Sequence, residues 1–172
     1  MKRIMVLGVS SGVGKSTFAQ QLGEKLGIDV YHLDRFYWDP GWKEAAMEDF
    51  RSRQEEVVVK ASWIMEGNYS NTYDIRATEA DTIIYLELPL RVCLFRVMKR
   101  RWEYRGDKTR PDIGEGCEEK LDWDFIKFII TTYRKRKKKM QVRFRNFQKV
   151  GQEKQVIQLK SQHDIHRFLE EL

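Results

Sequence analysis

The stretch VLGVSSGVGKST (residues 6–17) decides the fold expected of this chain. It is a glycine-rich turn that ends in Gly-Lys-Ser at positions 14–16, and it resembles the phosphate-binding pattern G-x-x-x-x-G-K-[ST]. The strict pattern has its first glycine where this chain has Val9, and Gly8 comes one residue too early. An apolar run at residues 4–7 precedes the turn, and apolar residues at helical spacing follow it. The sequence therefore predicts a phosphate-binding loop between a buried strand and a helix.

This loop predicts a site for ATP and magnesium. Such a loop points successive backbone N–H groups at one spot, where the dipole of the following helix also favours anions. The Lys15 side chain would reach the outer phosphates, and the Ser16 hydroxyl would bind a magnesium ion that bridges them. The alternative is an ordinary glycine-rich turn with an exposed lysine. The residues expected to bind the nucleotide are Gly12, Val13, Gly14, Lys15, Ser16 and Thr17.

Strand-like and helical segments alternate along the whole chain, which is typical of a parallel sheet covered by helices on both faces. Strands are expected at residues 4–7, 29–33, 62–68, 81–89 and 154–160. Helices are expected at residues 15–26, 43–61, 90–101 and 121–147, and after Ser161. The 172 residues fit a single α/β domain without an internal repeat or linker. A polar, glycine-bearing stretch predicts a lid around residues 102–120.

Carboxylates end three of the expected strands. Ligands of a parallel sheet bind beyond the carboxyl ends of its strands, and magnesium-dependent phosphoryl transfer needs acidic groups there. We expect Asp34 to receive the proton of an acceptor hydroxyl and to contact the acceptor, and Glu66 to contact metal and acceptor. Glu87 is a weaker candidate. The alternative for each of these carboxylates is a structural role, either as a helix cap or as an ion-pair partner.

Aromatic and basic side chains complete the expected site. The aromatic loop at residues 31–42 contains Trp38, whose flat ring suits an acceptor pocket, and Asn68 and Tyr69 follow Glu66 closely enough to line it. Arg101 and Arg105 are one helical turn apart beside the expected lid. They are expected to stabilise the charge on the transferred phosphate and so count as catalytic. The alternatives are aromatic residues packed in the core and arginines that are merely solvated.

The net charge is +6, and much of it comes from residues 134–145, where eight of twelve positions are Lys or Arg and none is acidic. Such a tract fits nucleic acid, polyphosphate ligands or a solvated helix face. The three histidines form no catalytic pattern, and Cys93 and Cys117 have no metal-ligand spacing. No apolar run approaches the 18 residues of a membrane span, so we expect a cytoplasmic protein with no membrane contact.

These residues together resemble the P-loop kinases of the adenylate-kinase-like group, and within it the bacterial proteins labelled DNA topology modulation proteins. The resemblance runs nearly end to end. The strings that carry it are MKRIMVLGVSSGVGKSTFAQQLGEKLGIDVYHLD, FYWDPGW, WIMEGNY, DIR, ADTIIYLELP, RGDKTRPDIGEGC and VIQLKSQHDIHRFLEEL. It implies a three-layer P-loop NTPase fold, with a five-stranded parallel sheet and a lid over the nucleotide. Nucleoside monophosphate kinases typically have Asp-Gly-Phe-Pro-Arg after strand three, where this chain has Glu-Gly-Asn-Tyr at residues 66–69.

Two functions follow from the sequence. The first is a magnesium-dependent kinase that transfers the γ-phosphate of ATP to a small acceptor, such as a nucleotide or nucleoside. The second is an ATP-binding regulator of DNA topology that contacts nucleic acid through the tract at residues 134–145. No helix-turn-helix or zinc pattern supports sequence-specific DNA recognition, so the kinase is the favoured hypothesis.

Overall fold

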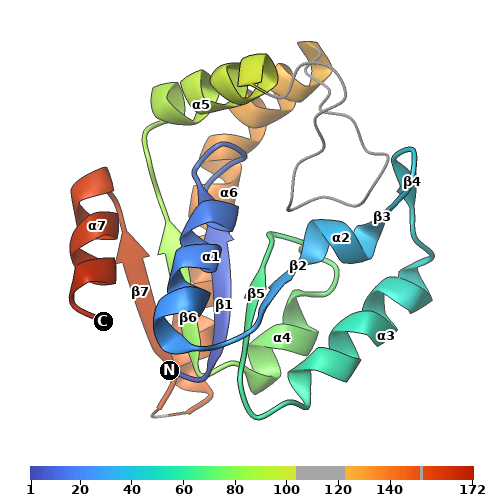
Figure 1. Ribbon diagram of the computed structural model, residues 1–172, viewed down its shortest axis with the longest axis vertical. Coiled ribbons are helices and arrows are strands. Elements are labelled where there is room, and N and C mark those ends of the chain that lie inside the picture. Colours follow the sequence, from blue (N-terminus) through green and yellow to red (C-terminus); the bar gives the residue numbers. More distant parts are fainter. Residues whose placement is uncertain (104–122, 152) are drawn as a thin grey trace.

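A central parallel sheet with helices on both faces organises the computed structural model, which describes residues 1–103, 123–151 and 153–172 (Figure 1). Five strands form this sheet, and every neighbouring pair is parallel. In spatial order the strands are β2 (Val30–His32), β5 (Trp63–Glu66), β1 (Arg3–Gly8), β6 (Thr82–Leu86) and β7 (Gln155–Leu159). The α/β fold with a five-stranded parallel sheet is thus confirmed.

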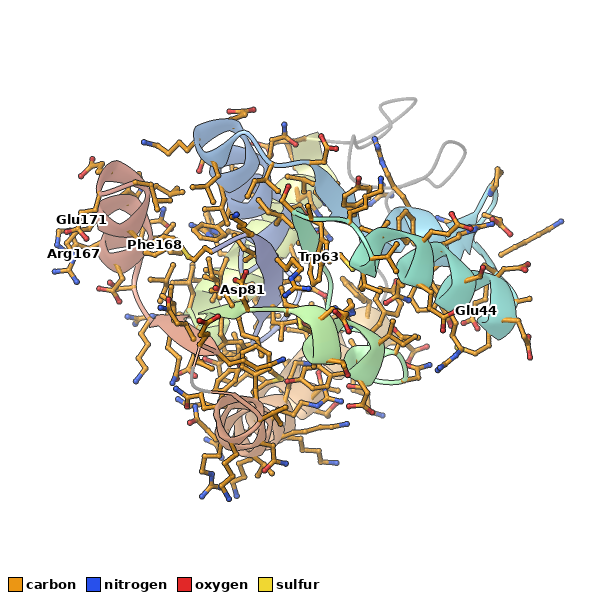
Figure 2. The ribbon with its side chains drawn as sticks, turned by 90° about the horizontal axis from the view of Figure 1, so that it is seen from below. Glu44, Trp63, Asp81, Arg167, Phe168 and Glu171 are labelled. Atoms are coloured by element: carbon orange, nitrogen blue, oxygen red, sulfur yellow. The ribbon has the colours of Figure 1, made fainter. Side chains whose placement is uncertain are left out.

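Four helices form the two outer layers. Seen from below, α1 lies on one side of the sheet and α6 on the other (Figure 2). Helices α1 and α7 pack against each other on the first side, where Phe168 points inward from α7 to lie 6.1 Å, ring to ring, from Phe18. On the second side, Phe144 of α6 lies 5.1 Å from Tyr85 of β6. The four helices are α1 (Lys15–Leu26), α4 (Tyr73–Glu79), α6 (Trp123–Lys149) and α7 (Gln162–Glu170).

Most of the remaining elements surround the carboxyl ends of the strands, at the upper end of the sheet in Figure 1, whereas α3 (Met47–Val58) lies lower and packs beside α4. A short helix, a two-stranded antiparallel hairpin and a longer helix follow β2 in that order, and another helix follows β6. These elements are α2 (Leu33–Tyr37), β3 (Trp38–Asp39), β4 (Lys43–Glu44), α3 (Met47–Val58) and α5 (Leu90–Glu103).

The core centres on β1. Its apolar run, residues 4–7, is buried on both faces, as expected of a central strand covered by helices. Each fully buried side chain of this kind contributes roughly 1.5–3 kcal/mol relative to an exposed one. The strand is paired with β5 on one side and β6 on the other, so the turn that follows it lies in the middle of the sheet edge.

Two helices occur where no helix was expected. Helix α2 lies in the aromatic segment expected to be irregular, and α4 lies between the third and fourth expected strands. With five and seven residues, both are too short for apolar periodicity to be recognised. The fully buried Arg76 anchors helix α4, because it donates a hydrogen bond to the Gly67 carbonyl outside the helix.

The predicted lid lies almost entirely outside the described residues. Its first two positions, 102 and 103, are the end of α5, and residues 104–122, with Arg105, are not described. Within the described ranges, none of the helices combines the length and the apolar character that crossing a membrane requires.

Candidate active site

Residues 9–14 form the turn between β1 and α1, and its geometry explains the shifted glycine pattern. The Val9 N–H donates to the Leu86 carbonyl at 2.9 Å, and the φ angle of Val9 is not positive, so this position needs no glycine. Gly8 has no room for a side chain, because a Cβ there would lie 2.5 Å from Val13 Cγ1 and 2.9 Å from Lys15 Cγ. The aliphatic stem of Lys15 therefore passes directly over Gly8.

The amino end of α1 faces the turn without a side-chain cap. Gly14 is the capping residue with a φ of 97°, and no acidic residue occupies the first turn of this helix. Gly12 has a φ of 77° and packs against α5, where a Cβ would lie 2.3 Å from the Cys93 carbonyl oxygen. The first amides of α1 have no partner inside the helix, and such amides are suited to bind phosphate oxygens.

A cleft of about 1480 Å³ lies at the carboxyl ends of the strands, between this turn, α2, α5 and α6. It brings together residues that are far apart in the sequence. The cleft is lined by all six residues expected to bind the nucleotide, at positions 12–17. The expected acceptor and metal residues that line it as well are Asp34, Trp38, Glu66, Asn68 and Tyr69.

Glu66 stands at the centre of the cleft, at the end of β5, with only 4% of its surface exposed. Its carboxylate accepts a hydrogen bond from the Ser16 hydroxyl at 3.2 Å and lies 3.6 Å from the Lys15 ammonium. Nδ1 of His32, at the end of β2, lies 3.0 Å from the same carboxylate. A buried carboxylate requires such partners, and here two of them belong to the first turn of α1.

Asp34, just after β2, is joined to Tyr69, just after β5. The Tyr69 hydroxyl donates to Asp34 Oδ1 at 2.7 Å. Burial and the adjacent Asp34 charge raise the pKa of Tyr69, so its hydroxyl stays protonated and remains a donor. The Tyr69 ring packs 4.9 Å, centroid to centroid, from both Tyr37 and Phe50, and Tyr37 lies 4.9 Å from Trp38. The aromatic loop thus contributes both to the core and to the cleft wall.

The segment after β5 is fixed by two hydrogen-bonding side chains. Asn68 accepts the Gly8 N–H at 3.0 Å, which ties this segment to the start of the turn between β1 and α1. Arg76 donates to the Gly67 carbonyl at 2.9 Å and to the Tyr69 carbonyl at 2.8 Å. Burial lowers the pKa of Arg76 to about 9, and the nearby Arg143 charge acts in the same direction. The guanidinium therefore remains charged at neutral pH and holds two backbone carbonyls in place.

Arginines reach the cleft from positions other than those expected. Arg100 lines the cleft, but Arg101 is not among the described lining residues, and Arg105 lies outside the described residues. Arg96 donates to the Val13 carbonyl at 3.1 Å, and Arg136 donates to the Val9 carbonyl at 3.5 Å. Two arginines from α5 and α6 thus contact the backbone of the turn between β1 and α1.

The basic tract at residues 134–145 is part of α6, and the helix divides its cations. Arg136 and Arg143 face the sheet side, and Lys137 pairs with the buried Glu87 at 2.7 Å. Glu87 is not among the described residues that line the cleft. It forms an ion pair instead, which is one of the alternatives considered from the sequence. Arg134, Lys138 and Arg145 are exposed. Contact of this tract with nucleic acid stays a prediction.

Two site residues have a partial signal in the sequence, and one has none. Arg136 precedes Met140 and Phe144 at helical spacing, which places it on the buried face of α6. Arg96 adjoins the buried Val97 and lies one turn after Cys93 in the same way. His32 meets Glu66 because β2 and β5 pair in that register, and register between distant strands is not visible in one sequence.

The comparisons with known proteins agree with this description of the fold. No family model matches the chain. One curated relative, Uncharacterized protein YqaC of Bacillus subtilis (strain 168), is 28% identical over 110 residues. The alignment covers 63% of this chain and 61% of the relative, so the chain spans less than two thirds of that protein's length.

Solved structures match over nearly the whole chain. Shikimate kinase from Bacteroides thetaiotaomicron has a TM-score of 0.56 at 17% identity, with 99% of this chain and 95% of that chain covered. A sugar kinase from Janibacter sp. HTCC2649 has a TM-score of 0.52 at 15% identity, with 99% and 93% covered. At these identities the likeness shows the fold alone, an α/β fold with a parallel sheet that this chain shares with these two kinases.

Proposed function

We propose that this chain is a phosphotransferase that moves the γ-phosphoryl group of ATP to a small acceptor. The observation that carries this proposal is the meeting of Lys15, Ser16 and Glu66 at the amino end of α1. A cation, a hydroxyl and a carboxylate converge there within 3.6 Å at the carboxyl edge of a parallel sheet. The fold shared with kinases supports the same reading, and the nucleotide would lie along residues 12–17.

The residues present fit a magnesium ion. The Ser16 hydroxyl and the Glu66 carboxylate are hard oxygen ligands 3.2 Å apart, and Mg²⁺ is typically held by one or two such groups together with waters and substrate phosphates. The described residues contain no cluster of three or more His, Cys, Asp or Glu arranged to hold a metal ion, so phosphate oxygens would complete the ligand set. When bound, the ion would neutralise charge that develops on the phosphates.

The remaining roles belong to the chain's own side chains. Asp34 would accept the proton of the attacking acceptor hydroxyl, with Tyr69 holding its carboxylate in place. The acceptor oxygen forms a bond to the γ-phosphorus, and the bond from that phosphorus to the β,γ-bridging oxygen breaks, which releases ADP. Lys15 would stabilise the transferred group, together with arginines. Trp38 and Asn68 would line the acceptor side. Catalytic roles for Arg101 and Arg105 stay predictions.

A transfer assay tests this function. Nucleosides, nucleotides and small alcohols are incubated with ATP and magnesium, and product formation is compared between wild type, Lys15→Ala and Lys25→Ala. Lys25 is an exposed lysine in the last turn of the same helix and serves as the matched control. We expect Lys15→Ala alone to lose ATP binding and turnover. Intact ATP binding and turnover in Lys15→Ala would overturn the proposal.

A further inference from the structure

A second, smaller pocket of about 190 Å³ lies between α6 and the segment after β5. Its volume corresponds to about six water molecules at about 30 Å³ each, which is enough for one tetrahedral oxyanion. Arg136, Asn68 and Ser70 line both this pocket and the cleft, so the two spaces adjoin. The other described lining residues are Thr132, Lys135, Lys139, Met140 and Arg143.

The lining is strongly and uniformly cationic. Four basic side chains surround the pocket, and none of its described lining residues is acidic. The lining residues of α6 share one helix face, since each of positions 132, 135, 136, 139, 140 and 143 lies three or four residues from another of them. The pocket therefore selects one face of the basic tract.

Two of the four cations are held in place before any ligand binds. Arg143 donates to the Ser70 hydroxyl at 3.3 Å and to the Ser70 carbonyl at 3.2 Å, and its guanidinium lies 3.9 Å from the centre of the Tyr73 ring. Arg136 is fixed through the Val9 carbonyl and lies 5.6 Å from the centre of the Phe128 ring. Partial burial lowers the pKa of both groups, although arginine remains charged at neutral pH.

Lys135 and Lys139 complete the outer side of the pocket. Both are exposed, and within the described ranges no carboxylate pairs with either of them. Asp74 is the acidic residue that acts on Arg143, and Glu87 pairs with Lys137, which does not line the pocket. Among the four cations, Arg136 is partly buried and no described carboxylate is among the groups that act on it, so a bound anion would offset the cost of its desolvation.

We propose that this pocket binds a phosphoryl group, carried either by a phosphate monoester or by free inorganic phosphate. Bidentate guanidinium groups and lysine ammonium groups match a dianion with three or four acceptor oxygens. As part of the acceptor, the group would enter from the cleft past Asn68 and Arg136, and that version rests on the proposed function. As free phosphate, it would bind whether or not the chain transfers phosphate.

Calorimetry with a filled nucleotide site tests the pocket directly. The protein is saturated with magnesium and a non-hydrolysable ATP analogue, and inorganic phosphate is titrated into it. We expect saturable binding that weakens at least tenfold in the double variant Lys135→Gln/Lys139→Gln. The matched control is Arg134→Gln/Lys138→Gln, which removes two exposed charges at the same spacing outside the pocket. We expect the control to bind phosphate as wild type does.

Paired acceptors distinguish the two sources. A nucleoside and its monophosphate, and a sugar and its phosphate, are compared as acceptors in all three proteins. If the pocket holds the acceptor's phosphoryl group, the pocket variant raises KM for the phosphorylated member at least tenfold and leaves KM for ATP unchanged. If it holds free phosphate, the pocket variant leaves both KM values unchanged and abolishes the calorimetric binding.

Two results overturn the proposal. One is phosphate binding, or an acceptor KM, that both double variants change equally, since this would reflect general surface charge. The other is the combination of no saturable phosphate binding to the wild-type protein and no change of acceptor KM in the pocket variant. The affinity for the ATP analogue, measured in the same experiments, reports separately on the proposed function, so the two failures are distinguishable.

Discussion

The Ser16 hydroxyl and the Glu66 carboxylate lie 3.2 Å apart, although the two residues are separated by fifty positions in the sequence. Their meeting joins the first turn of α1 to the end of β5. The same carboxylate also contacts Lys15 and His32, so three elements converge on one buried charge. We therefore regard Glu66 as the residue on which the assembly of the cleft depends.

Removing the charge of Glu66 is expected to affect turnover far more than removing another buried carboxylate. Glu66→Gln would lose the ion pair with Lys15 and, under the proposed function, the carboxylate that would bind magnesium, which is expected to reduce kcat by roughly 100-fold or more. Glu87→Gln is the matched control, because Glu87 directly follows β6, which is separated from β5 by β1, and pairs with Lys137 outside the cleft. Steady-state kinetics against magnesium concentration measure the difference. Equal losses in the two variants would contradict a specific role for Glu66.

The turn glycines offer a second comparison. Gly12→Ala is expected to abolish ATP binding, because its φ of 77° disfavours alanine and its Cβ would lie 2.3 Å from the Cys93 carbonyl oxygen. Gly27→Ala shares the positive φ, at 64°, but its Cβ would meet no atom within 4 Å. The control is expected to cost only about 1–2 kcal/mol of stability and to bind ATP normally. Urea unfolding and ATP titration measure both effects, and normal ATP binding by Gly12→Ala would refute the steric argument.

Arg76 is expected to be a stability residue that also positions the cleft wall. Arg76→Met would leave the Gly67 and Tyr69 carbonyls without their donor, at an expected cost of about 2–6 kcal/mol in the free energy of unfolding. Arg76→Lys can replace only part of this pair of bonds, so its free energy of unfolding is expected to lie between those of wild type and Arg76→Met. Arg51→Met, at an exposed arginine of α3, is the control. Chemical denaturation of the three variants decides whether the buried bonds carry this stability.

Asp81 is expected to make the stability of the fold sensitive to acid. Partial burial opposes its ionisation, but hydrogen bonds from the Thr82 hydroxyl and the backbone N–H groups of Arg3 and Lys2 prevail and lower its pKa. The ionised form therefore stabilises the folded state above the pKa of the unfolded chain. This contribution is lost as the pH falls through the lower pKa of the folded state.

Unfolding midpoints measured from pH 7 down to about pH 3 test this dependence. Asp81→Asn is expected to be less stable than wild type at neutral pH and to lose less stability on acidification. Glu56→Gln, at an exposed position of α3, is expected to follow the wild-type profile. Parallel acid profiles of wild type and Asp81→Asn would rule out this role for Asp81.

The sequence alone predicted the parts of this molecule that depend on local pattern. The apolar run at residues 4–7, the turn before α1 and the alternation of strands and helices led directly to the fold that is observed. The carboxyl-end rule for parallel sheets selected Asp34 and Glu66, which line the cleft, but it also selected Glu87, which is not among the described lining residues. What remained hidden depends on pairing between distant elements, such as the register that places His32 beside Glu66.

The contacts made by individual side chains of a long helix could not be predicted from the sequence either. The eight cations of the tract look alike in the sequence, but α6 directs Arg136 toward the turn between β1 and α1 and Lys137 toward Glu87. Short helices were not predicted, for a different reason. Five residues of α2 make little more than one turn, so its helical character follows from the aromatic contacts around Tyr37 rather than from periodicity.

The strand order has a consequence for how the chain is made. β1 ends at Gly8, but its two partners begin only at Trp63 and Thr82. During translation, the apolar residues of β1 therefore emerge from the ribosome long before either neighbouring strand exists to cover them. Such exposed segments attract chaperones and self-associate. The nascent chain must keep its most central strand shielded until β6 has been synthesised.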